Sequence, residues 1–429
     1  MILWSEGSPH AAIGPERARE ALFAALERLG PRKRVLVVPP DATRAHSESG
    51  PLTGAAWEYY GRAVEAVLPA LGTHAPMSDA EIAAMFGRVP RGLFRVHDWR
   101  RSVRTLGEVP AGFVTGVSEG RVGYAIPVEV DELVAGRAHD LILSIGQVVP
   151  HEVAGMAGHA KNIFVGTGGP GVINRTHFLG AAYGMERIMG RAETPVRRVL
   201  GYAAEHFAKG LPIVYVLTVV GRGENGRLAL RGLFIGDDEE CFRRAAALAL
   251  EVNVELLDRP LGKAVVFLDP REYRTTWLGN KSIYRTRMGL ADGGELVVLA
   301  PGVERFGEDP EIDALIRKYG YSGTPRILEL VERESDLRES LCAAAHLIHG
   351  STEGRFTVTY CPGRMTREEI EGAGYRFGDL AAMAKRYDPE RLSPGFNRLP
   401  DGETIFFIPN PALGLWAARD RFPQAKERP

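Results

Sequence analysis

Residues 140–177 read DLILSIGQVVPHEVAGMAGHAKNIFVGTGGPGVINRTH, and this stretch decides both the fold and the place of the site. It starts with an apolar run, residues 140–146, that is typical of a buried strand. The 27 residues from His151 to His177 then contain one lysine, three histidines and six glycines. Glycine lets the backbone approach a ligand closely. The stretch therefore predicts a strand that leads into a cofactor site.

Short apolar runs alternate with helical patterns along the first part of the chain. Pro15 and Gly30 bracket a helix, and Val35–Val38 form the strand that follows it. Further strands are predicted at residues 121–130, 140–146, 212–220 and 263–270. Further helices are predicted near residues 57–71, after a capping box of Ser78 and Glu81, and at 178–190 and 240–257. Alternating strands and helices indicate an α/β protein.

A second set of elements follows residue 270. Helices are predicted at 278–290, 310–319, 336–348 and from Thr366, strands at 295–301 and 356–360, and a turn at ADGG, residues 291–294. Since 429 residues exceed what one hydrophobic core usually holds, we expect two α/β domains with a cofactor and substrate cleft between them. The expected N-terminal, cofactor-binding domain spans residues 1–260, and the C-terminal domain spans 261–401. The tail, residues 402–429, is expected to return to the first domain.

The composition argues against several classes of function. The 53 basic and 54 acidic residues nearly cancel, which gives no indication of nucleic acid binding. No apolar run of the sequence is long enough to span a bilayer, and the first residues lack the basic start of a secretory signal, so we expect a cytoplasmic protein without a membrane partner. The cysteines are far apart in sequence: Cys241, Cys342 and Cys361. This spacing supports neither disulfides nor a thiolate metal site, so a bound metal would take histidine.

Two histidines are candidates for proton transfer. His151 follows the apolar strand 140–146, and His74 lies in a turn ahead of a predicted helix. A neutral imidazole can act as general acid or base near pH 7. Two histidines on opposite faces of a substrate could take and return a proton on either side, which inversion of a stereocentre requires. The alternative for each is a histidine of the core or the surface.

Lys161 and His177 are candidates for holding a cofactor. Lys161 lies between small residues and an apolar pair, and a desolvated amine is a nucleophile that can form a covalent link. A solvated surface lysine is the alternative. His177 precedes an apolar helix and could ligate nickel, copper, zinc or iron, with further donors supplied by a bound organic cofactor. Its alternative is a histidine at a helix start that bonds to the backbone.

Two segments could bind a phosphate or another anion. Asp41, Thr43 and Arg44 follow the strand Val35–Val38, at the end where open α/β sheets bind ligands. Arginine suits bidentate capture of an anion. The loop VGTGGPG, residues 165–171, could cradle a phosphate with its amides, although it matches no phosphate-loop motif.

The second predicted domain offers residues for an anionic substrate. Trp277, Asn280 and Lys281 lie at the start of a predicted helix, where they could bind such a substrate from across the cleft. A solvated helix face is the alternative.

Other histidines are assigned no catalytic part. His97 is followed by Asp98, and this pair favours a surface ion pair. His346 and His349 fit a helix face near the edge of a core.

Taken together, these motifs resemble the nickel-pincer-nucleotide-dependent lactate racemase family. The family's central pattern has a histidine, a lysine ten residues later and a second histidine sixteen residues after that, and His151, Lys161 and His177 fit it. PPDATR, residues 39–44, is similar to the family's DxTR turn, and GTHAPMSDAEI, which begins just before His74, to its GTHRPMT motif. Lys281 and the later ADGGELVVLA are similar to its YQxxK helix and PGG strand.

The resemblance implies a cofactor and its attachment. Lys161 would carry the pyridinium-3,5-bisthiocarboxylic acid mononucleotide through a thioamide, and His177 would complete a square-planar nickel. Asp41 and Thr43 would lie near the nucleotide or the base. Cofactor-maturation proteins would be partners of the chain.

The resemblance also implies a reaction. The chain would be an isomerase, a racemase or epimerase that inverts the C2 centre of a 2-hydroxy acid by hydride transfer to and from the cofactor. His74 and His151 would be the acid/base pair. Arg44 and Lys281 would hold the substrate's carboxylate.

Two departures from the family pattern bear on the substrate. His159 replaces a glycine, and Trp277 and Leu278 replace the tyrosine and glutamine of YQxxK, with Asn280 in the loop. These positions face substrate in the family. They point beyond a lactate-like acid to a larger one, such as a sugar acid, whose hydroxyls would bond to Asn280 and His159.

Two other functions remain open. A pyridine-nucleotide-dependent 2-hydroxy acid oxidoreductase would use similar domains and a histidine base, but it would bind its cofactor reversibly. A nickel or nucleotide carrier would bind metal without turning over any 2-hydroxy acid.

Overall fold

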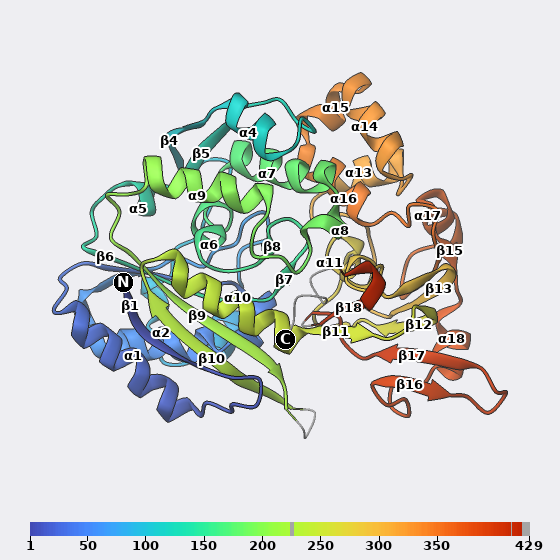
Figure 1. Cartoon of the computed structure of the whole chain (residues 1–429), viewed down its shortest axis with the longest axis horizontal. Coiled ribbons are helices and arrows are strands. Elements are labelled where there is room, and N and C mark those ends of the chain that lie inside the picture. Colours follow the sequence, from blue (N-terminus) through green and yellow to red (C-terminus); the bar gives the residue numbers. More distant parts are fainter. Residues whose placement is uncertain (224–226, 413, 423–429) are drawn as a thin grey trace. The chain divides into compact units, whose positions relative to one another are not determined.

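The computed structural model describes residues 1–223, 227–412 and 414–422, and the chain divides into two compact units (Figure 1). Unit 1 comprises residues 1–183 and 187–253, and unit 2 comprises residues 184–186 and the described chain from Val254 onward. Each unit contains a mainly parallel sheet together with helices, so the predicted α/β class is confirmed.

Unit 1 is built on a sheet with the strand order β1-β10-β9-β6-β2-β3. These strands are β1 (Ile2–Gly7), β2 (Val35–Val38), β3 (Val64–Val67), β6 (Leu141–Gln147), β9 (Ile213–Arg222) and β10 (Leu228–Gly236). Neighbours from β3 to β9 are parallel, whereas β10 pairs antiparallel with β9 and β1. Every residue of β2 and β6 is buried, as expected of central strands in a parallel sheet.

Two short strand pairs lie outside this sheet, and both are antiparallel. They are β4 (Val103–Val109) with β5 (Ile126–Asp131), and β7 (Pro150–His151) with β8 (Gly155–Met156). The β7–β8 pair follows β6, and the short helix η1 (Ala42–Ser47) follows β2. Because β2 and β6 are parallel neighbours, both segments begin at the same edge of the sheet, where open α/β sheets bind ligands.

Two helices of unit 1 begin at residues with suitable capping chemistry. α1 (Pro15–Leu29) has Pro15 in its first turn and stops at Gly30, whose φ of 76° suits glycine. The predicted capping box of Ser78 and Glu81 is confirmed at the start of α3 (Asp79–Phe86). The other helices are α2 (Ser49–Tyr60), η2 (Gly61–Ala63), η3 (Arg91–Leu93), α4 (Ala111–Val117), α5 (Glu132–Ala135), α6 (Ala160–Phe164), α7 (Pro170–Tyr183), α9 (Pro195–Phe207) and α10 (Glu239–Asn253). α8 (Met185–Ile188) begins in unit 2 and ends in unit 1.

Helices cover the sheet of unit 1 and form its core. Leu22 of α1, Leu52 of α2 and Ile82 of α3 pack with Val37 and Leu143 of the sheet in one buried cluster. α10 packs on β9 and β10 (Figure 1). Removal of this much apolar surface from water is the main stabilising contribution to such a core.

The predicted helix over residues 57–71 is wrong. α2 ends at Tyr60, and the following residues form β3, which pairs with β2. Gly61, with φ of 53°, stops the helix, and the sequence Val-Glu-Ala-Val then forms a strand in which only Glu65 is exposed. The helix predicted to reach residue 257 also stops early, because α10 ends at Asn253 and β11 (Val254–Leu257) begins there.

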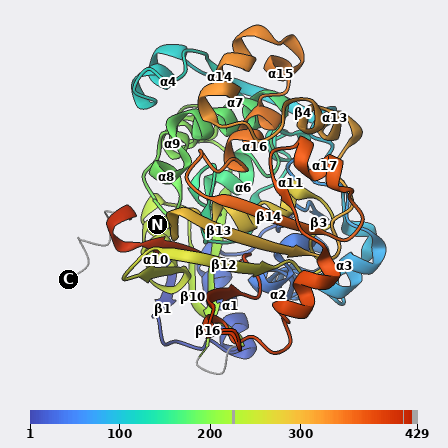
Figure 2. The same ribbon diagram turned by 90° about the vertical axis from the view of Figure 1, so that its right-hand side faces the viewer.

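Unit 2 contains a second sheet with the order β15-β14-β13-β12-β17-β16, parallel except for β16 (Figure 2). Its strands are β12 (Leu261–Phe267), β13 (Leu290–Ala300), β14 (Thr357–Pro362), β15 (Arg376–Phe377), β16 (Gly395–Arg398) and β17 (Thr404–Ile408). β11 pairs in parallel with β18 (Leu415–Ala418). The helices are α11 (Thr276–Gly279), α12 (Lys281–Tyr284), α13 (Pro310–Tyr319), α14 (Thr324–Arg333), α15 (Ser335–Glu339), α16 (Leu341–His349), α17 (Arg367–Gly372), α18 (Leu380–Arg386) and η4 (Arg419–Arg421).

Two local predictions for unit 2 are corrected. The segment ADGG lies within β13 instead of forming a separate turn, and Gly293 takes a φ of 77° there. The helix predicted over 278–290 is reduced to the short α11 and α12. Gly279 and Gly289, which are poor helix formers, lie at the end of α11 and just before β13.

The expectation that the tail of the chain returns to the first unit is wrong. β17 pairs with β12, and β18 pairs with β11, so the described tail belongs to unit 2. Four of the five residues of β17 are buried, and β12 supplies hydrogen-bonding partners along one edge of that strand. Residues 423–429 of the predicted tail lie outside the described residues.

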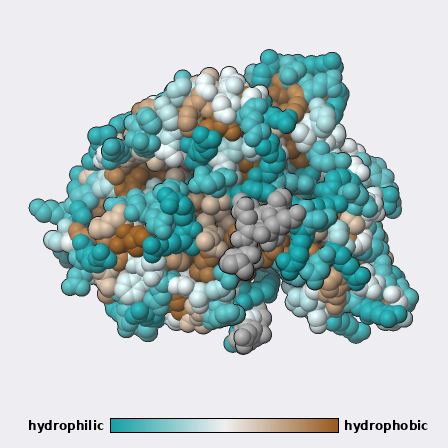
Figure 3. Space-filling model, in the orientation of Figure 1, coloured by the Kyte–Doolittle hydropathy of each residue, from teal (hydrophilic) through white to brown (hydrophobic). Residues whose placement is uncertain are grey.

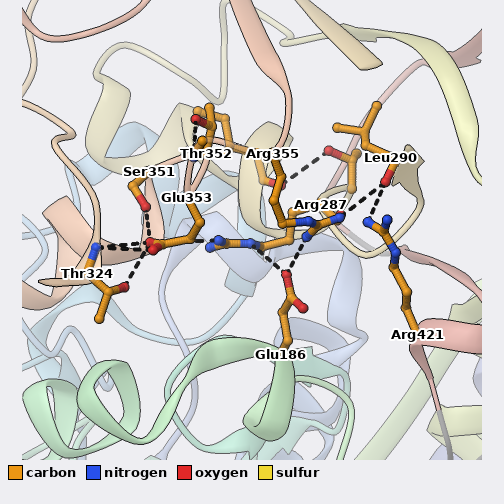
Figure 4. A network of polar contacts seen from close by, with 12 residues as sticks. Glu186, Arg287, Leu290, Thr324, Ser351, Thr352, Glu353, Arg355 and Arg421 are labelled. Atoms are coloured by element: carbon orange, nitrogen blue, oxygen red, sulfur yellow. Dashed lines mark hydrogen bonds and ion pairs between the residues drawn. The ribbon is translucent and has the colours of Figure 1, made fainter. Parts of the chain in front are cut away.

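A charged network includes the segment 184–186 in unit 2 (Figure 4). Glu186 accepts a hydrogen bond from Nη1 of Arg355 at 2.7 Å and lies 3.4 Å from Nε of Arg287. Burial lowers the pKa of Arg287, and the charges of Glu186 and Glu353 oppose that shift. The buried guanidinium of Arg287 therefore has carboxylate partners, and a buried charge is usually paired in this way.

The surface carries isolated apolar residues. Hydrophobic and hydrophilic residues are interspersed on the face shown in Figure 3. In the described part of the chain the exposed large hydrophobic side chains are Met1, Tyr59, Val96, Leu228 and Phe396. Single exposed apolar side chains are ordinary on a protein surface. Among the helices that the structure describes, none combines the length and the hydropathy needed to cross a membrane.

Candidate active site

His74 is oriented by a buried carboxylate beyond the end of β2. Oδ2 of Asp41 lies 2.6 Å from Nδ1 of His74. The backbone N–H and the hydroxyl of Thr43 donate to the other oxygen of Asp41, at 3.2 and 2.5 Å. Burial raises the pKa of Asp41, but the charge and hydrogen bond of His74, with the Thr43 hydroxyl, outweigh it and lower the pKa. An ionised Asp41 accepts the Nδ1 proton of His74, so Nε2 carries the lone pair that a base needs.

His151 is held in the opposite way. Its Nδ1 accepts hydrogen bonds from the backbone N–H groups of Val153 at 3.1 Å and Ala154 at 3.4 Å. A nitrogen that accepts hydrogen bonds carries no proton, so the ring proton lies on Nε2. Burial lowers the pKa of His151 well below 6.5, Glu152 opposes that shift, and Lys161 adds to it. His151 is therefore a neutral imidazole with a donor at Nε2.

Lys161 lies in the first turn of α6 and is partly buried. Its amine has no hydrogen-bond or ion-pair partner among the residues that the structure describes. Burial lowers its pKa from 10.5 to about 8, the charge of Arg44 adds to the shift, and Glu152 opposes it. An amine in these surroundings is partly neutral near pH 7 and can act as a nucleophile.

His177 lies in α7 with one ring nitrogen tied to the helix backbone. Nδ1 donates to the carbonyl oxygen of Ile173 at 2.7 Å. This bond leaves a lone pair on Nε2, which is the arrangement of a metal-ligating histidine. Burial lowers the pKa of His177 to about 4, so its ring is neutral at pH 7. Within residues 1–223, 227–412 and 414–422, no group of three or more His, Cys, Asp or Glu side chains could hold a metal ion, so a metal at His177 would need donors from a cofactor.

These side chains form one electrostatic group in unit 1. The residues that are linked by hydrogen bonds, or because the charge of one affects the pKa of another, are Asp41, Thr43, Arg44, His74, His151, Lys161 and His177. Gln147, at the end of β6, is also buried, and neither polar atom of its side chain has a hydrogen-bond partner in the described structure. A buried amide of this kind is suited to bind a ligand.

The glycines of the loop 165–171 serve packing within the protein. The carboxylate of Glu129 accepts the N–H groups of Gly171 at 2.7 Å and Val172 at 3.4 Å, and these are among the first amides of α7. A Cβ on Gly169 would lie 2.5 Å from Oε2 of Glu129, so a larger residue would not fit. The hypothesis that this loop cradles a phosphate is therefore wrong for these amides.

His97 is a buried residue, so the predicted surface ion pair with Asp98 is wrong. Its side chain is fully buried, with Nδ1 2.8 Å from Oδ2 of Asp131 and Nε2 3.1 Å from the carbonyl oxygen of Gly168. Each ring nitrogen thus faces an acceptor oxygen. The pair fixes the loop ahead of α7. Local sequence could not indicate this, because Asp131 is 34 residues away.

His159 has the surroundings of a core residue. Its side chain is 7% exposed, and its ring packs against Tyr215 and Phe242 with centroid distances of 3.9 and 5.4 Å. Nδ1 lies 3.5 Å from Oε2 of Glu239. Burial, with the charge of Arg197, lowers the pKa of His159 to about 3. The structure thus gives the predicted substrate contact of His159 no support.

Arg197 holds the loop between β8 and α6 by hydrogen bonds. Its Nη2 donates to the carbonyl oxygens of Met156, of Ala157 at 3.1 Å and of Gly158 at 3.0 Å. Its charge also contributes to the lowered pKa of Lys161. No local motif indicates these contacts, because the carbonyl groups lie about 40 residues before Arg197.

The candidate residues of unit 2 lie in α11 and α12 or between them. Asn280 is fully buried, and its Nδ2 donates to Oη of Tyr375 at 3.2 Å, so it too has the surroundings of a core residue. Trp277 is partly buried and stacks on His346 at a centroid distance of 4.4 Å. Lys281 is partly buried, with Nζ 5.8 Å from the centroid of a tyrosine ring.

Comparisons with known proteins concern the family and the fold. Residues 22–187 match the family described as the lactate racemase N-terminal domain. A crystal structure of a protein from Thermotoga maritima is similar, with a TM-score of 0.80 and 26% identity over 95% of this chain and 99% of that one. The lactate racemase apoprotein from Thermoanaerobacterium thermosaccharolyticum has a similar fold, with a TM-score of 0.70 and 16% identity over 95% of this chain and 94% of that one. A comparison with curated proteins gave no match. Residues 22–187 are thus similar to the lactate racemase N-terminal domain, and the chain shares the fold of the lactate racemase apoprotein.

Proposed function

We propose that this protein is an isomerase that inverts the C2 centre of a 2-hydroxy acid, with a nickel-pincer nucleotide bound covalently to Lys161. The observation that carries the proposal is the grouping of Lys161, His177, His74 and His151 in unit 1. A nucleophilic amine, a neutral imidazole ligand and two histidines near the reacting atoms are the protein groups that such a reaction needs. The substrate is a lactate-like acid or a larger one, such as a sugar acid.

The residues of unit 1 fit this cofactor. The amine of Lys161, with its pKa of about 8, is suited to form a thioamide, and His177 offers the lone pair of Nε2 to nickel. The buried amide of Gln147 offers a donor and an acceptor to the bound nucleotide. When bound, the cofactor would accept a hydride from C2 and return it. Asp41 orients His74, so we assign it to the base rather than to the nucleotide.

The remaining chemistry belongs to the side chains. His74 takes the proton of the 2-hydroxyl through Nε2, and Asp41 stabilises the imidazolium that forms. Arg44 pairs with the substrate's carboxylate, for which its forked donors are suited. Lys281 and Trp277 of unit 2 are further substrate contacts that the family resemblance implies.

Intact-mass measurement tests the attachment of the cofactor. Protein produced together with the cofactor-maturation proteins should carry added mass, which Lys161→Ala should lose and Lys33→Ala, a change at an exposed lysine, should keep. His177→Ala should keep the organic adduct but lose nickel in elemental analysis. An active enzyme without a covalent adduct would overturn the proposal and favour a reversibly bound nucleotide.

A screen of chiral 2-hydroxy acids tests the reaction itself. Each acid is incubated with the modified protein, and optical rotation is followed with time. The proposal expects loss of rotation for at least one acid and none with Lys161→Ala. Retention of metal and adduct without turnover of any acid would instead favour a carrier protein.

A further inference from the structure

We propose that a pocket of unit 1 binds a small organic cation with an apolar body, an ammonium or guanidinium compound, and that Glu48 pairs with its charge. The pocket is lined by α1, by α2 and by the chain just after α3, and its volume is about 330 Å³. α1 and α2 pack against each other in unit 1 (Figure 1). None of the described residues that line the pocket belongs to the candidate active site. The proposal therefore concerns a second site and does not depend on the proposed function.

Apolar side chains form part of the pocket wall. Leu52 and Ala55 of α2 and Val89 after α3 are buried, and Trp57 of α2 is partly buried. Sites for small molecules have volumes of roughly 300 to 1,000 Å³ and are lined mostly by apolar side chains with a few polar groups. The pocket lies at the low end of this range, so it suits a small molecule with an apolar body.

The charged side chains of the pocket leave one negative charge in excess. Its carboxylates belong to Glu16, Glu48 and Glu58. Its guanidinium groups belong to Arg19 and Arg88. Arg19 and Glu58 neutralise each other, since Nε and Nη2 of the arginine lie 3.1 and 2.5 Å from the two carboxylate oxygens. A ligand with a single positive charge would balance the excess.

Glu48 is the carboxylate of the pocket that most needs a partner. Glu16 and Glu58 are exposed to water, whereas Glu48 is partly buried and burial raises its pKa. Its side chain makes no hydrogen bond or ion pair with the residues that the structure describes. A charge that is partly removed from water without a partner is unfavourable. A cation bound in the pocket would supply that partner.

The backbone at Glu48 indicates a role other than stability. Its φ of 62° and ψ of 6° lie in the left-handed region, which residues other than glycine and asparagine rarely adopt. Glu48 directly precedes α2, yet its side chain donates or accepts no capping hydrogen bond there. A strained residue whose side chain makes no stabilising contact is typical of a functional site.

Trp57 provides a second contact for a cation. An ammonium or guanidinium group is attracted to the face of an aromatic ring, and tryptophan gives the strongest attraction. The carboxylate of Glu48 and the indole of Trp57 line the same pocket. Together they combine an anionic partner with an aromatic surface, which is the chemistry that recognises organic cations.

A matched pair of probes tests the recognition of charge. Binding of 2-phenylethylammonium to the full chain is titrated by saturation-transfer NMR, with 2-phenylethanol as a neutral probe of the same shape. The ammonium compound should bind at least about tenfold more tightly, because a hydrogen bond to a charged group contributes more than one between neutral groups. Equal affinities for the two probes would overturn the proposal.

Substitutions locate the preference for the ammonium compound. Glu48→Gln should abolish it, and Trp57→Leu should weaken binding of the ammonium compound more than binding of the alcohol. Glu20→Gln is the matched control, since Glu20 lies on α1, is 65% exposed and does not line the pocket. It should keep the preference. Circular dichroism checks the fold of each variant. A preference that persists in Glu48→Gln would place the cation elsewhere and overturn the proposal.

A zwitterion is the competing ligand, because the exposed Arg88 could take a carboxylate. Phenylalanine adds a carboxylate to the same ammonium compound. It should bind more weakly than 2-phenylethylammonium if the pocket takes a cation. Tighter binding of phenylalanine that is lost in Arg88→Gln would overturn the assignment to cations.

The strain at Glu48 gives a test that does not depend on the choice of probe. Glu48→Gly should raise the midpoint of urea unfolding, because glycine adopts this φ without strain, and it should lose the preference for the ammonium compound. A lower midpoint would show that the glutamate side chain contributes to the fold, which would contradict its role in binding.

Discussion

Lys161 should react with amine reagents near neutral pH much faster than an ordinary lysine. Burial lowers its pKa from 10.5 to about 8. At pH 7 such an amine is neutral in about one molecule in eleven, whereas an amine with a pKa of 10.5 is neutral in about one in 3,000. The neutral form is the one that reacts, so the expected advantage in the reactive fraction at pH 7 is about 300-fold.

Competitive labelling of the protein without cofactor measures this difference. Short pulses of an acylating reagent at pH 6 to 10, followed by digestion and mass spectrometry, give a rate for each lysine. The rate at Lys161 should rise with a midpoint near pH 8, with the exposed Lys33 as an internal reference. Arg197→Met removes one of the positive charges that lower this pKa, so it should move the midpoint upward.

A midpoint above pH 10 at Lys161 would refute the reasoning. It would show that the amine is hydrated in solution despite its partial burial, and the case for a nucleophilic lysine would fail. Circular dichroism of Arg197→Met must match that of the unchanged protein, because a disordered loop would also raise the midpoint.

The other predictions concern stability and proton transfer. Lys161→Met should raise the free energy of unfolding at pH 7 by about 3 kcal/mol, because the lysine pKa is about 2.5 units lower in the folded protein and each unit corresponds to about 1.36 kcal/mol. This gain should shrink as the pH rises from 8 to 10.5, because the folded protein then holds a neutral lysine and, near pH 10.5, the unfolded chain loses the proton as well. Glu129→Ala should cost about 2 kcal/mol in urea unfolding, because two helix amides lose their acceptor, and Glu129→Gln should cost less. Asp131→Ala should cost about 3 to 5 kcal/mol, since His97 stays buried without its carboxylate. Asp41→Asn should lower turnover by about 100- to 10,000-fold with the cofactor adduct intact, because an amide does not fix the same histidine tautomer.

Contrary results would be informative for each change. A gain in stability of Lys161→Met that does not vary with pH would show that the amine is not desolvated. Unfolding midpoints that stay the same in the Glu129 and Asp131 variants would mean that water replaces the lost acceptors. Full turnover in Asp41→Asn would remove the carboxylate from proton transfer.

The fold could be predicted where the signals are local. The apolar run before His151 and the strand Val35–Val38 are strands in the structure, and Pro15, Ser78 and Glu81 mark helix starts as their chemistry requires. Pairing between distant segments could not be predicted, because it depends on which strand edge is open. The tail strand Thr404–Ile408 is an example, since its apolar pattern suits any sheet and only the edge of β12 decides its place.

For the candidate site, too, local signals could be read from the sequence and distant contacts could not. Spacing singled out Lys161, His177, His151 and His74, and the structure gathers them in one unit. Spacing could not show how each ring is held, because the partners of the rings are backbone groups or lie far away in sequence. His159 illustrates the limit of a motif, since the sequence pattern suggested a substrate contact, whereas the ring packs against Tyr215 and Phe242.

The placement of His159 has a consequence for protein engineering. Its backbone takes a φ of 54°, which glycine adopts without strain, while its ring fills the space against Tyr215 and Phe242. A homologue with glycine at this position would relieve the backbone but leave that space to be filled by larger side chains at positions 215 or 242. We therefore expect these three positions to change as a set. A mutant library aimed at new substrates should vary them together, because single exchanges would report lost packing rather than altered recognition.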